Sequence, residues 1–219
     1  MAQTRGAMFL SGAFPLKDYA EFDGINDLAT WSFDEDADDG GAAIGFNVGL
    51  KWYFNVGVKG LGAMLSVDGI YNGPNSELKK YYNDSEFNVG QLGSAKYTST
   101  PKYINVPIML GLNYIYHFNP NFGFYVEAGA GGDMRFITEM VYTNETVLVS
   151  GKTTHKYDMG FGFAYQVGAG FEVAQNLVVG VSFYDLGKTS IKGSVNDRIV
   201  DHFGTIRPMM VLARIGFSF

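Results

Sequence analysis

The stretch FGFYVEAGAGGDMRF, residues 122–136, alternates between two kinds of side chain. Its even-numbered positions carry Phe, Val, Ala, Met and one Gly, whereas its odd-numbered positions carry Gly, Tyr and single charged residues. A period of two places successive side chains on opposite faces of a β-strand. The stretch therefore predicts a long strand with one apolar face and one face of small, polar and charged side chains.

The same alternation recurs along the chain and predicts an all-β protein of eight strands. The other strands are expected at residues 42–52, 61–67, 104–116, 157–171, 177–183 and 209–219, together with residues 5–14, where the alternation is weaker. None of the positions in the apolar phase of the alternating stretches carries a charge.

The second face of these strands decides the class of β protein. In a soluble sheet the face turned away from the core carries polar residues that meet water. Here that face is mostly Gly, Ala, Ser, Asn and Tyr. We interpret the large apolar face as lipid-facing and the small polar face as the lining of a narrow lumen. Strands in lipid must close into a barrel, and eight strands form a barrel whose interior is filled by side chains.

Composition excludes several other classes. The chain has 219 residues, 17% of them charged, against about 25% in soluble domains, and it contains no Cys. Disulfide scaffolds and thiolate metal sites are therefore excluded, and a net charge of −6 argues against nucleic-acid binding. No apolar run reaches the ~20 residues of a membrane helix. We expect a single domain over residues 1–219.

The connections between the predicted strands alternate between short and long. Short ones lie at residues 54–60, 117–121 and 173–176, and long polar ones at residues 15–40, 73–100, 143–154 and 187–205. Short periplasmic turns and long extracellular loops are typical of bacterial outer-membrane barrels. We expect location in that membrane, with a secretory signal peptide removed ahead of this chain.

Aromatic residues gather at the ends of the predicted strands. Such girdles form where a barrel meets the membrane interface. At the short-turn end we expect a girdle of Trp52, Tyr114, Tyr116, Phe122, Phe171, Phe217 and Phe219, together with Phe54, Phe118 and Phe124. At the opposite rim we expect Tyr71, Tyr103, Phe136, Tyr142, Tyr157 and Phe183.

Two segments carry a family resemblance. The last strand, MVLARIGFSF (residues 210–219), resembles the C-terminal signal of Gram-negative outer-membrane barrels, and NVPIMLGLNY (residues 105–114) is similar to a strand of the PorT-type branch. The chain as a whole resembles the small OmpA/OmpX-like outer-membrane barrels. The resemblance implies that the barrel-assembly machinery reads the strand ending in Phe219. Because Pro removes a ladder hydrogen bond, we expect bulges at Pro107 and Pro208.

The inward phase holds a set of charges that must pair if they are buried. We expect a salt-bridged plug that includes Glu127 and Arg214, rather than an ion path. Its members are Lys51, Asp68, Glu127, Asp133, Arg135 and Arg214, with Asp158 and Glu172 in the same phase.

Residues 15–40 hold nine acidic residues and one basic residue, and therefore most of the charge imbalance. The run that contains Asp34, Asp36 and Asp38 superficially resembles a calcium loop, but Asp39 and Gly45 stand where that loop needs Gly and Glu. The clustered carboxylates could bind a cation weakly. The alternative interpretation is a solvated surface loop without a ligand. Trp31 and Phe33, beside this run, suggest contact with a partner or with another loop.

The resemblance leaves the function open between several classes. We expect a non-enzymatic barrel, without a cofactor, that meets outer-membrane lipid or lipopolysaccharide and acts in surface interaction or envelope integrity through loops 15–40 and 73–100. A lipid-A-modifying enzyme would use His155 or His202 with Asp158, Asp201 or Ser194, although no spacing marks a triad. A narrow channel is a third reading. A soluble lipocalin-like binder is a fourth, and it would turn the apolar phase inward.

Overall fold

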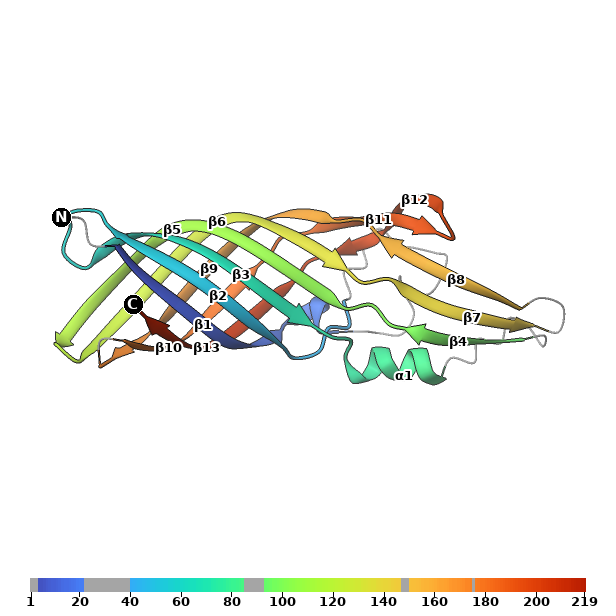
Figure 1. Cartoon of the computed structure of the whole chain (residues 1–219), viewed down its shortest axis with the longest axis horizontal. Helices are drawn as coiled ribbons and strands as arrows, with labels where there is room; N and C mark the ends of the chain where they lie inside the picture. The colour runs from blue at the N-terminus through green and yellow to red at the C-terminus, as the bar shows by residue number, and fades with distance from the viewer. Residues whose placement is uncertain (1–3, 22–39, 85–92, 147–149, 175) are drawn as a thin grey trace.

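The computed structural model describes residues 4–21, 40–84, 93–146, 150–174 and 176–219. Eight strands form a closed barrel in the order β1-β13-β10-β9-β6-β5-β3-β2, with every neighbouring pair antiparallel (Figure 1). They are β1 (Thr4–Pro15), β2 (Gly45–Asn55), β3 (Leu61–Asn72), β5 (Tyr103–Asn119), β6 (Phe122–Ile137), β9 (Gly160–Val173), β10 (Leu177–Asp185) and β13 (Met209–Ser218). Each corresponds to one predicted strand, so the predicted fold class is confirmed.

The first and last strands close the barrel. β1 pairs with β13 from Ala7↔Ser218 to Pro15↔Met210, and the backbones of Gly6 and Phe219 exchange two hydrogen bonds of 2.9 Å. Closure leaves the barrel without an unpaired strand edge, which lipid would not tolerate.

The barrel wall carries its apolar side chains on the outside. Leu110 and Phe163 are each 69% exposed, whereas the neighbouring inward side chain of Met109 is fully buried. Charged and amide side chains lie inside, where Lys51 and Asn47 are each 1% exposed. Water would disfavour such a wall and lipid favours it, so the barrel spans a membrane. The soluble binder with an apolar interior is therefore a wrong alternative.

Inward glycines make room for large side chains in the narrow interior. The ring of Tyr125 lies against Gly170 and Gly180, where an added Cβ would come within 2.7 and 2.4 Å of the tyrosine oxygen. Small residues on the next two strands of the wall, β9 and β10, thus make room for the Tyr125 side chain inside the barrel.

A second sheet extends from the end of the barrel that carries the long connections (Figure 1). Its order is β12-β11-β8-β7-β4. The members are β4 (Gly93–Ser99), β7 (Met140–Thr146), β8 (Ser150–Tyr157), β11 (Thr189–Val195) and β12 (Arg198–Ile206). The first long connection also contains the short helix η1 (Lys17–Tyr19) and the second contains α1 (Ser76–Asp84).

This outer sheet corrects the prediction of plain polar loops at residues 73–100, 143–154 and 187–205. Its strands have only seven to nine residues, and Thr, Ser and Lys dilute their alternation. Their pairing brings together segments that are far apart in the chain, such as β8 and β11. Of the two helices in the described part of the chain, neither has the length and apolarity needed to cross a membrane.

An apolar cluster joins the outer sheet to the barrel. Tyr103, Ile137 and Leu186 from the barrel end pack in one cluster with Ile191 and Phe203 from the sheet. The sheet is therefore anchored by burial of apolar side chains.

Three expectations about single residues were wrong. Pro107 keeps the β5–β6 register opposite Asp133 without a bulge, and Pro208 precedes β13 rather than lying within a strand. Tyr103 points inward, where it is fully buried and donates a hydrogen bond to the carbonyl of Gly40, so it takes no part in an aromatic rim.

Candidate functional site

A layer of four paired charges crosses the middle of the lumen. Lys51 on β2 forms an ion pair with Glu127 on β6. Arg214 on β13 lies 3.5 Å from Glu127 Oε1 and 3.3 Å from Asp68 Oδ1 on β3. All four side chains are at most 1% exposed. Two cations and two anions therefore balance within one layer, as buried charges require.

Neutral polar side chains complete this layer. They were not predicted from the sequence, which indicated the charged residues only. Tyr184 donates a hydrogen bond of 2.9 Å to Asp68 Oδ2 and accepts one from Arg214. Asn47 donates to Asp68 Oδ1 at 3.1 Å and accepts from Ser11 at 3.0 Å. These residues occupy inward positions of their strands, as the charged residues do. That position in the alternation is the sequence feature from which they could have been predicted. They satisfy carboxylate lone pairs that the cations leave unfilled.

Arg135 and Asp133 form a separate pair nearer the outer sheet. Their Nη2 and Oδ2 atoms are 3.0 Å apart, and Arg135 also donates to Asn105 Oδ1 at 3.0 Å and to the Ile206 carbonyl at 3.1 Å. The charges predicted to form one plug therefore form two separate groups at different heights in the lumen. Asp158 lies exposed between strands, outside the lumen, because β9 begins only at Gly160.

Glu172 lies at the short-turn mouth of the barrel, away from the other predicted lumen charges. Its partner is Arg5, at 2.6 Å, with His117 at 3.9 Å. Arg5 was missed because residues 5–14 alternate weakly.

The aromatic residues expected at the short-turn end lie on the outer wall there. Phe217 and Phe219 are 54% and 74% exposed, and Tyr116 is 54% exposed. Ring contacts run from Tyr116 to Phe118 (5.2 Å), on to Phe122 (5.6 Å) and then to Phe171 (5.3 Å), across three neighbouring strands. The other members Trp52, Phe54, Tyr114 and Phe124 occupy outward positions of the same strand ends.

The opposite rim differs from the expectation. Phe46 and Tyr71 contact each other at 5.2 Å, and Phe136 is 40% exposed on the wall. Tyr142 and Tyr157 belong instead to the outer sheet, where they pack against His155 and Phe203 respectively. The aromatic rim therefore has fewer members than the sequence indicated, because Tyr142 and Tyr157 lie on strands of the outer sheet and not of the barrel.

The candidate cation loop lies outside the described residues. Asp34, Asp36 and Asp38, with Trp31 and Phe33, all fall within residues 22–39. Their expected role stays a prediction. Across the ranges that the structure describes, three or more metal-ligating side chains do not gather at any point.

The histidines considered for catalysis lie in the outer sheet. His202 Nδ1 is 2.8 Å from the hydroxyl of Ser190, rather than near Ser194. The ring of His155 lies between Tyr142 (5.7 Å) and Phe203 (5.8 Å), and neither of its nitrogens has a hydrogen-bond partner among the described residues. Within the same residues, no carboxylate orients either imidazole, so the geometry does not assemble a triad.

The half-buried imidazole of His155, whose two nitrogens are shielded from solvent, predicts a pH-sensitive outer sheet. Burial lowers the pKa of His155 below its usual value, because the charged form loses hydration. The unfolded sheet therefore binds more protons than the folded one, and stability falls as the pH drops below the unfolded value of about 6.5. We expect amide exchange in β7, β8 and β11, corrected for intrinsic rates, to become several-fold less protected between pH 7.5 and 5.

Two variants check this expectation. His155→Phe keeps the ring and removes the titration, so its exchange protection is expected to stay constant over that pH range. His202→Asn removes the imidazole on β12 and is expected to leave the pH dependence of the parent. Equal pH dependence in the parent and in His155→Phe would contradict the assignment to His155.

Comparisons with known proteins found similar solved structures but no family. No protein-family model matches the chain, and no curated protein matches it. Among solved structures, Ail of Yersinia pestis is 13% identical with a TM-score of 0.41, covering 99% of this chain and 97% of its own. Neisserial surface protein A is 10% identical with a TM-score of 0.46, covering 100% and 97%. The outer membrane protein OprG from Pseudomonas aeruginosa is 11% identical with a TM-score of 0.41, covering 99% and 94%.

Proposed function

We propose that this chain, which has the eight-stranded architecture of the small OmpA/OmpX-like outer-membrane barrels, is an integral outer-membrane protein that acts without catalysis as a platform for surface interaction. The observation that carries the proposal is the outer sheet. It is a five-stranded structure anchored to the barrel end by buried apolar side chains. A membrane anchor alone would not need such an extension.

The interior supports the same proposal. The charged layer fills the lumen at mid-height, and the apolar cluster that includes Tyr103 and Ile137 lies between this layer and the outer sheet. Moving an ion along this path would require breaking buried ion pairs, which is costly. A conducting bore is therefore disfavoured. The outer sheet and the long connections, which lie outside the membrane, are then the surfaces that can bind a partner.

The outer sheet offers exposed side chains of mixed character. Ile199 on β12 is 84% exposed, and Lys156 on β8 pairs with Asp197 at 2.9 Å on the surface. The described parts of the connections 15–40 and 73–100, which are residues 15–21, 40, 73–84 and 93–100, adjoin this end of the barrel. We propose that they bind an extracellular partner together with the sheet, that the outer wall contacts lipid and lipopolysaccharide, and that the barrel-assembly machinery recognises the strand ending in Phe219.

The test removes four of the five strands of the outer sheet, β7, β8, β11 and β12, and keeps the barrel. Because Arg135 pairs with Gly160 and Asp185 pairs with Met209, short loops that contain Asn-Gly can replace residues 139–158 and 189–206. We expect attachment of expressing cells to wells coated with collagen, mucin or glycosaminoglycan to fall to the level of cells without the protein. Uptake of a hydrophobic dye is expected to stay unchanged. Unchanged attachment with raised dye uptake would instead assign the protein to envelope integrity.

Single-cysteine labelling provides the control for orientation, since the parent chain has no Cys. Ile199→Cys in the outer sheet is expected to react with a membrane-impermeant maleimide on intact cells. Asn121→Cys, in the turn between β5 and β6 at the opposite end, is expected to react only after the outer membrane is permeabilised. The reverse pattern would place the sheet on the wrong side for this function.

A further inference from the structure

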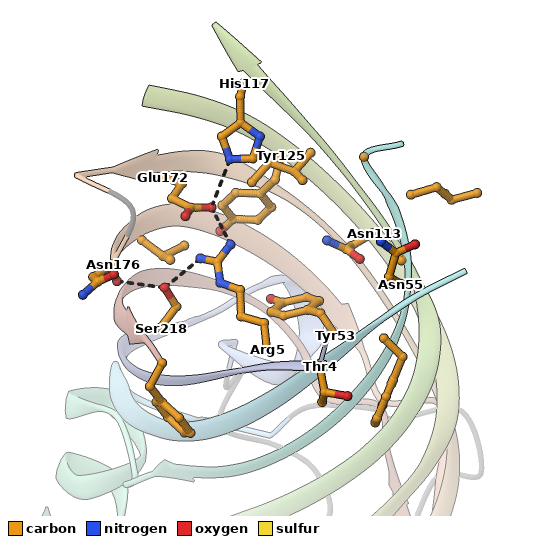
Figure 2. A pocket seen from close by; sticks show the side chains of 17 residues that line it. Thr4, Arg5, Tyr53, Asn55, Asn113, His117, Tyr125, Glu172, Asn176 and Ser218 are labelled. Carbon is orange, nitrogen blue, oxygen red and sulfur yellow. Dashed lines mark hydrogen bonds and ion pairs between the residues drawn. The ribbon is translucent and has the colours of Figure 1, made fainter. Parts of the chain in front are cut away.

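The barrel has a cavity at the mouth opposite the outer sheet. Its volume is about 500 Å³, and residues from the short-turn ends of the strands line it (Figure 2). Known small-molecule sites have volumes of about 300–1,000 Å³. We call this cavity the vestibule. In the orientation proposed above, it opens toward the periplasm, and the layer of Lys51, Glu127 and Arg214 lies deeper in the lumen.

One wall of the vestibule carries charges that already balance each other. Arg5 Nη1 lies 2.6 Å from Glu172 Oε2, and Arg5 Nη2 donates a hydrogen bond of 2.7 Å to Ser218 Oγ. His117 Nε2 lies 3.9 Å from the same carboxylate oxygen of Glu172. A charged ligand would therefore have to compete with an existing ion pair, whichever sign it carries. This wall favours a neutral ligand that can accept from Arg5 or donate to Glu172.

The facing wall carries amides and tyrosines. Figure 2 shows Asn55 and Asn113 across the vestibule from Glu172, Asn176 and Ser218, with the ring of Tyr53 beside Arg5. The Oδ1 atom of Asn113 is shielded from solvent and accepts no hydrogen bond from the described residues. A buried acceptor without a donor is unfavourable, so turning this amide toward the vestibule, where a ligand hydroxyl or N–H can donate to it, would be stabilising.

Glycines keep this wall open. A Cβ added at Gly62 would lie 2.5 Å from Asn113 Oδ1, and one at Gly60 would lie 2.5 Å from the Ile115 carbonyl. A side chain at Gly62 would therefore occupy the space in front of the Asn113 amide oxygen, whereas one at Gly60 would meet the Ile115 carbonyl and the Tyr114 ring. The absence of a side chain at Gly62 gives the Asn113 amide its place in the vestibule wall.

We propose that the vestibule binds a neutral saccharide of one or two rings. Sugar hydroxyls both donate and accept hydrogen bonds, and this lining offers donors (Arg5) as well as acceptors (Glu172, Asn113). The C–H faces of a sugar ring are apolar and pack on aromatic rings, which Tyr53 and Tyr125 supply. This site faces away from the outer sheet and does not depend on the function proposed for that sheet.

The probe for this proposal is N,N′-diacetylchitobiose, with maltose as a second neutral disaccharide and glucose 6-phosphate as a charged ring of similar shape. The full chain is held in a micelle without sugar headgroups, and amide chemical shifts are followed by NMR. At least one neutral disaccharide is expected to give saturable shifts at Tyr53, Asn113 and Glu172. Glucose 6-phosphate is expected to bind at least tenfold more weakly.

Variants decide whether binding occurs in the vestibule. Asn113→Ala removes the unpartnered acceptor and is expected to weaken saccharide binding about tenfold, the effect of one hydrogen bond. Asn55→Ala changes the same wall near a turn and keeps the test usable if Asn113→Ala folds poorly. Asn121→Ala, at the same end but outside the vestibule, is the matched control and is expected to bind as the parent does. Three results would each overturn the proposal: no saturation by either disaccharide, equal binding of the phosphate, or parent affinity in both wall variants.

Discussion

Glu127→Ala is expected to lower the free energy of unfolding of the membrane-embedded barrel by about 3–5 kcal/mol, the usual effect of removing one partner of a buried ion pair. Glu127 contacts both Lys51 and Arg214, and all three side chains are at most 1% exposed. Removing its carboxylate leaves two cations and one anion, Asp68, in a layer without room for hydration.

The measurement is equilibrium unfolding in denaturant with the protein in phospholipid vesicles, followed by tryptophan fluorescence. Glu172→Ala is the matched control. Its partner Arg5 is 32% exposed, so water can solvate the guanidinium, and we expect a loss of about 1 kcal/mol or less. A double change of Lys51→Met and Glu127→Met removes one charge of each sign and is expected to recover most of the lost stability. A Glu127→Ala protein as stable as the parent would mean that water fills the layer, which would reopen the possibility of a bore.

Leu110→Arg is expected to destabilise the same barrel by about 2–4 kcal/mol, as cations do on the lipid face near the bilayer midplane. Leu110 lies near the middle of β5, opposite Leu65 on β3 and Ala130 on β6, and is 69% exposed on the outer wall. In water such an exposed position would tolerate Arg with little cost. The size of the effect therefore reports directly on the solvent around the wall.

Ile199→Arg is the matched control for the lipid-face variant. Ile199 is also an exposed aliphatic residue, at 84%, but it belongs to the outer sheet. We expect its substitution to change stability by less than about 0.5 kcal/mol, as for most surface changes. The same unfolding assay in vesicles measures both. Equal effects of the two substitutions would place the wall and the sheet in the same medium and would remove the basis for a membrane-spanning barrel.

Local patterns predicted the barrel strands well because each of them is long. Residues 104–116 and 122–136 alternate over many positions, and the structure has β5 and β6 across both. The outer sheet was not predicted, because its strands are short and their polar residues obscure the alternation. Its stability depends on contacts such as that of Phe203 with Tyr157, which join segments separated by a whole barrel strand pair.

The lumen charges show the limit of prediction most clearly. Eight charged residues were predicted to lie together because all of them occupy inward positions in the alternation. The structure instead places Glu172 at the mouth, Arg135 near the outer sheet and Asp158 outside the barrel. Height along the axis depends on how far each strand is displaced relative to its neighbours, and that displacement is set by the closure of the whole sheet. Tyr184 was missed because phase alone does not show which neutral side chains meet a charge, and Arg5 because residues 5–14 alternate weakly.

By itself, the sequence determined the number of barrel strands and which face of each meets lipid, because both follow from a period of two that is written into each strand separately. The tertiary structure alone decided which charges pair and that the long connections form a sheet. It also decided that a vestibule lies at one mouth, where the Asn113 oxygen has no hydrogen-bond partner among the described residues. These features depend on the register between strands that are distant in the chain. Register is a property of the closed barrel as a whole, since each strand can take its position only when both of its neighbours are in place.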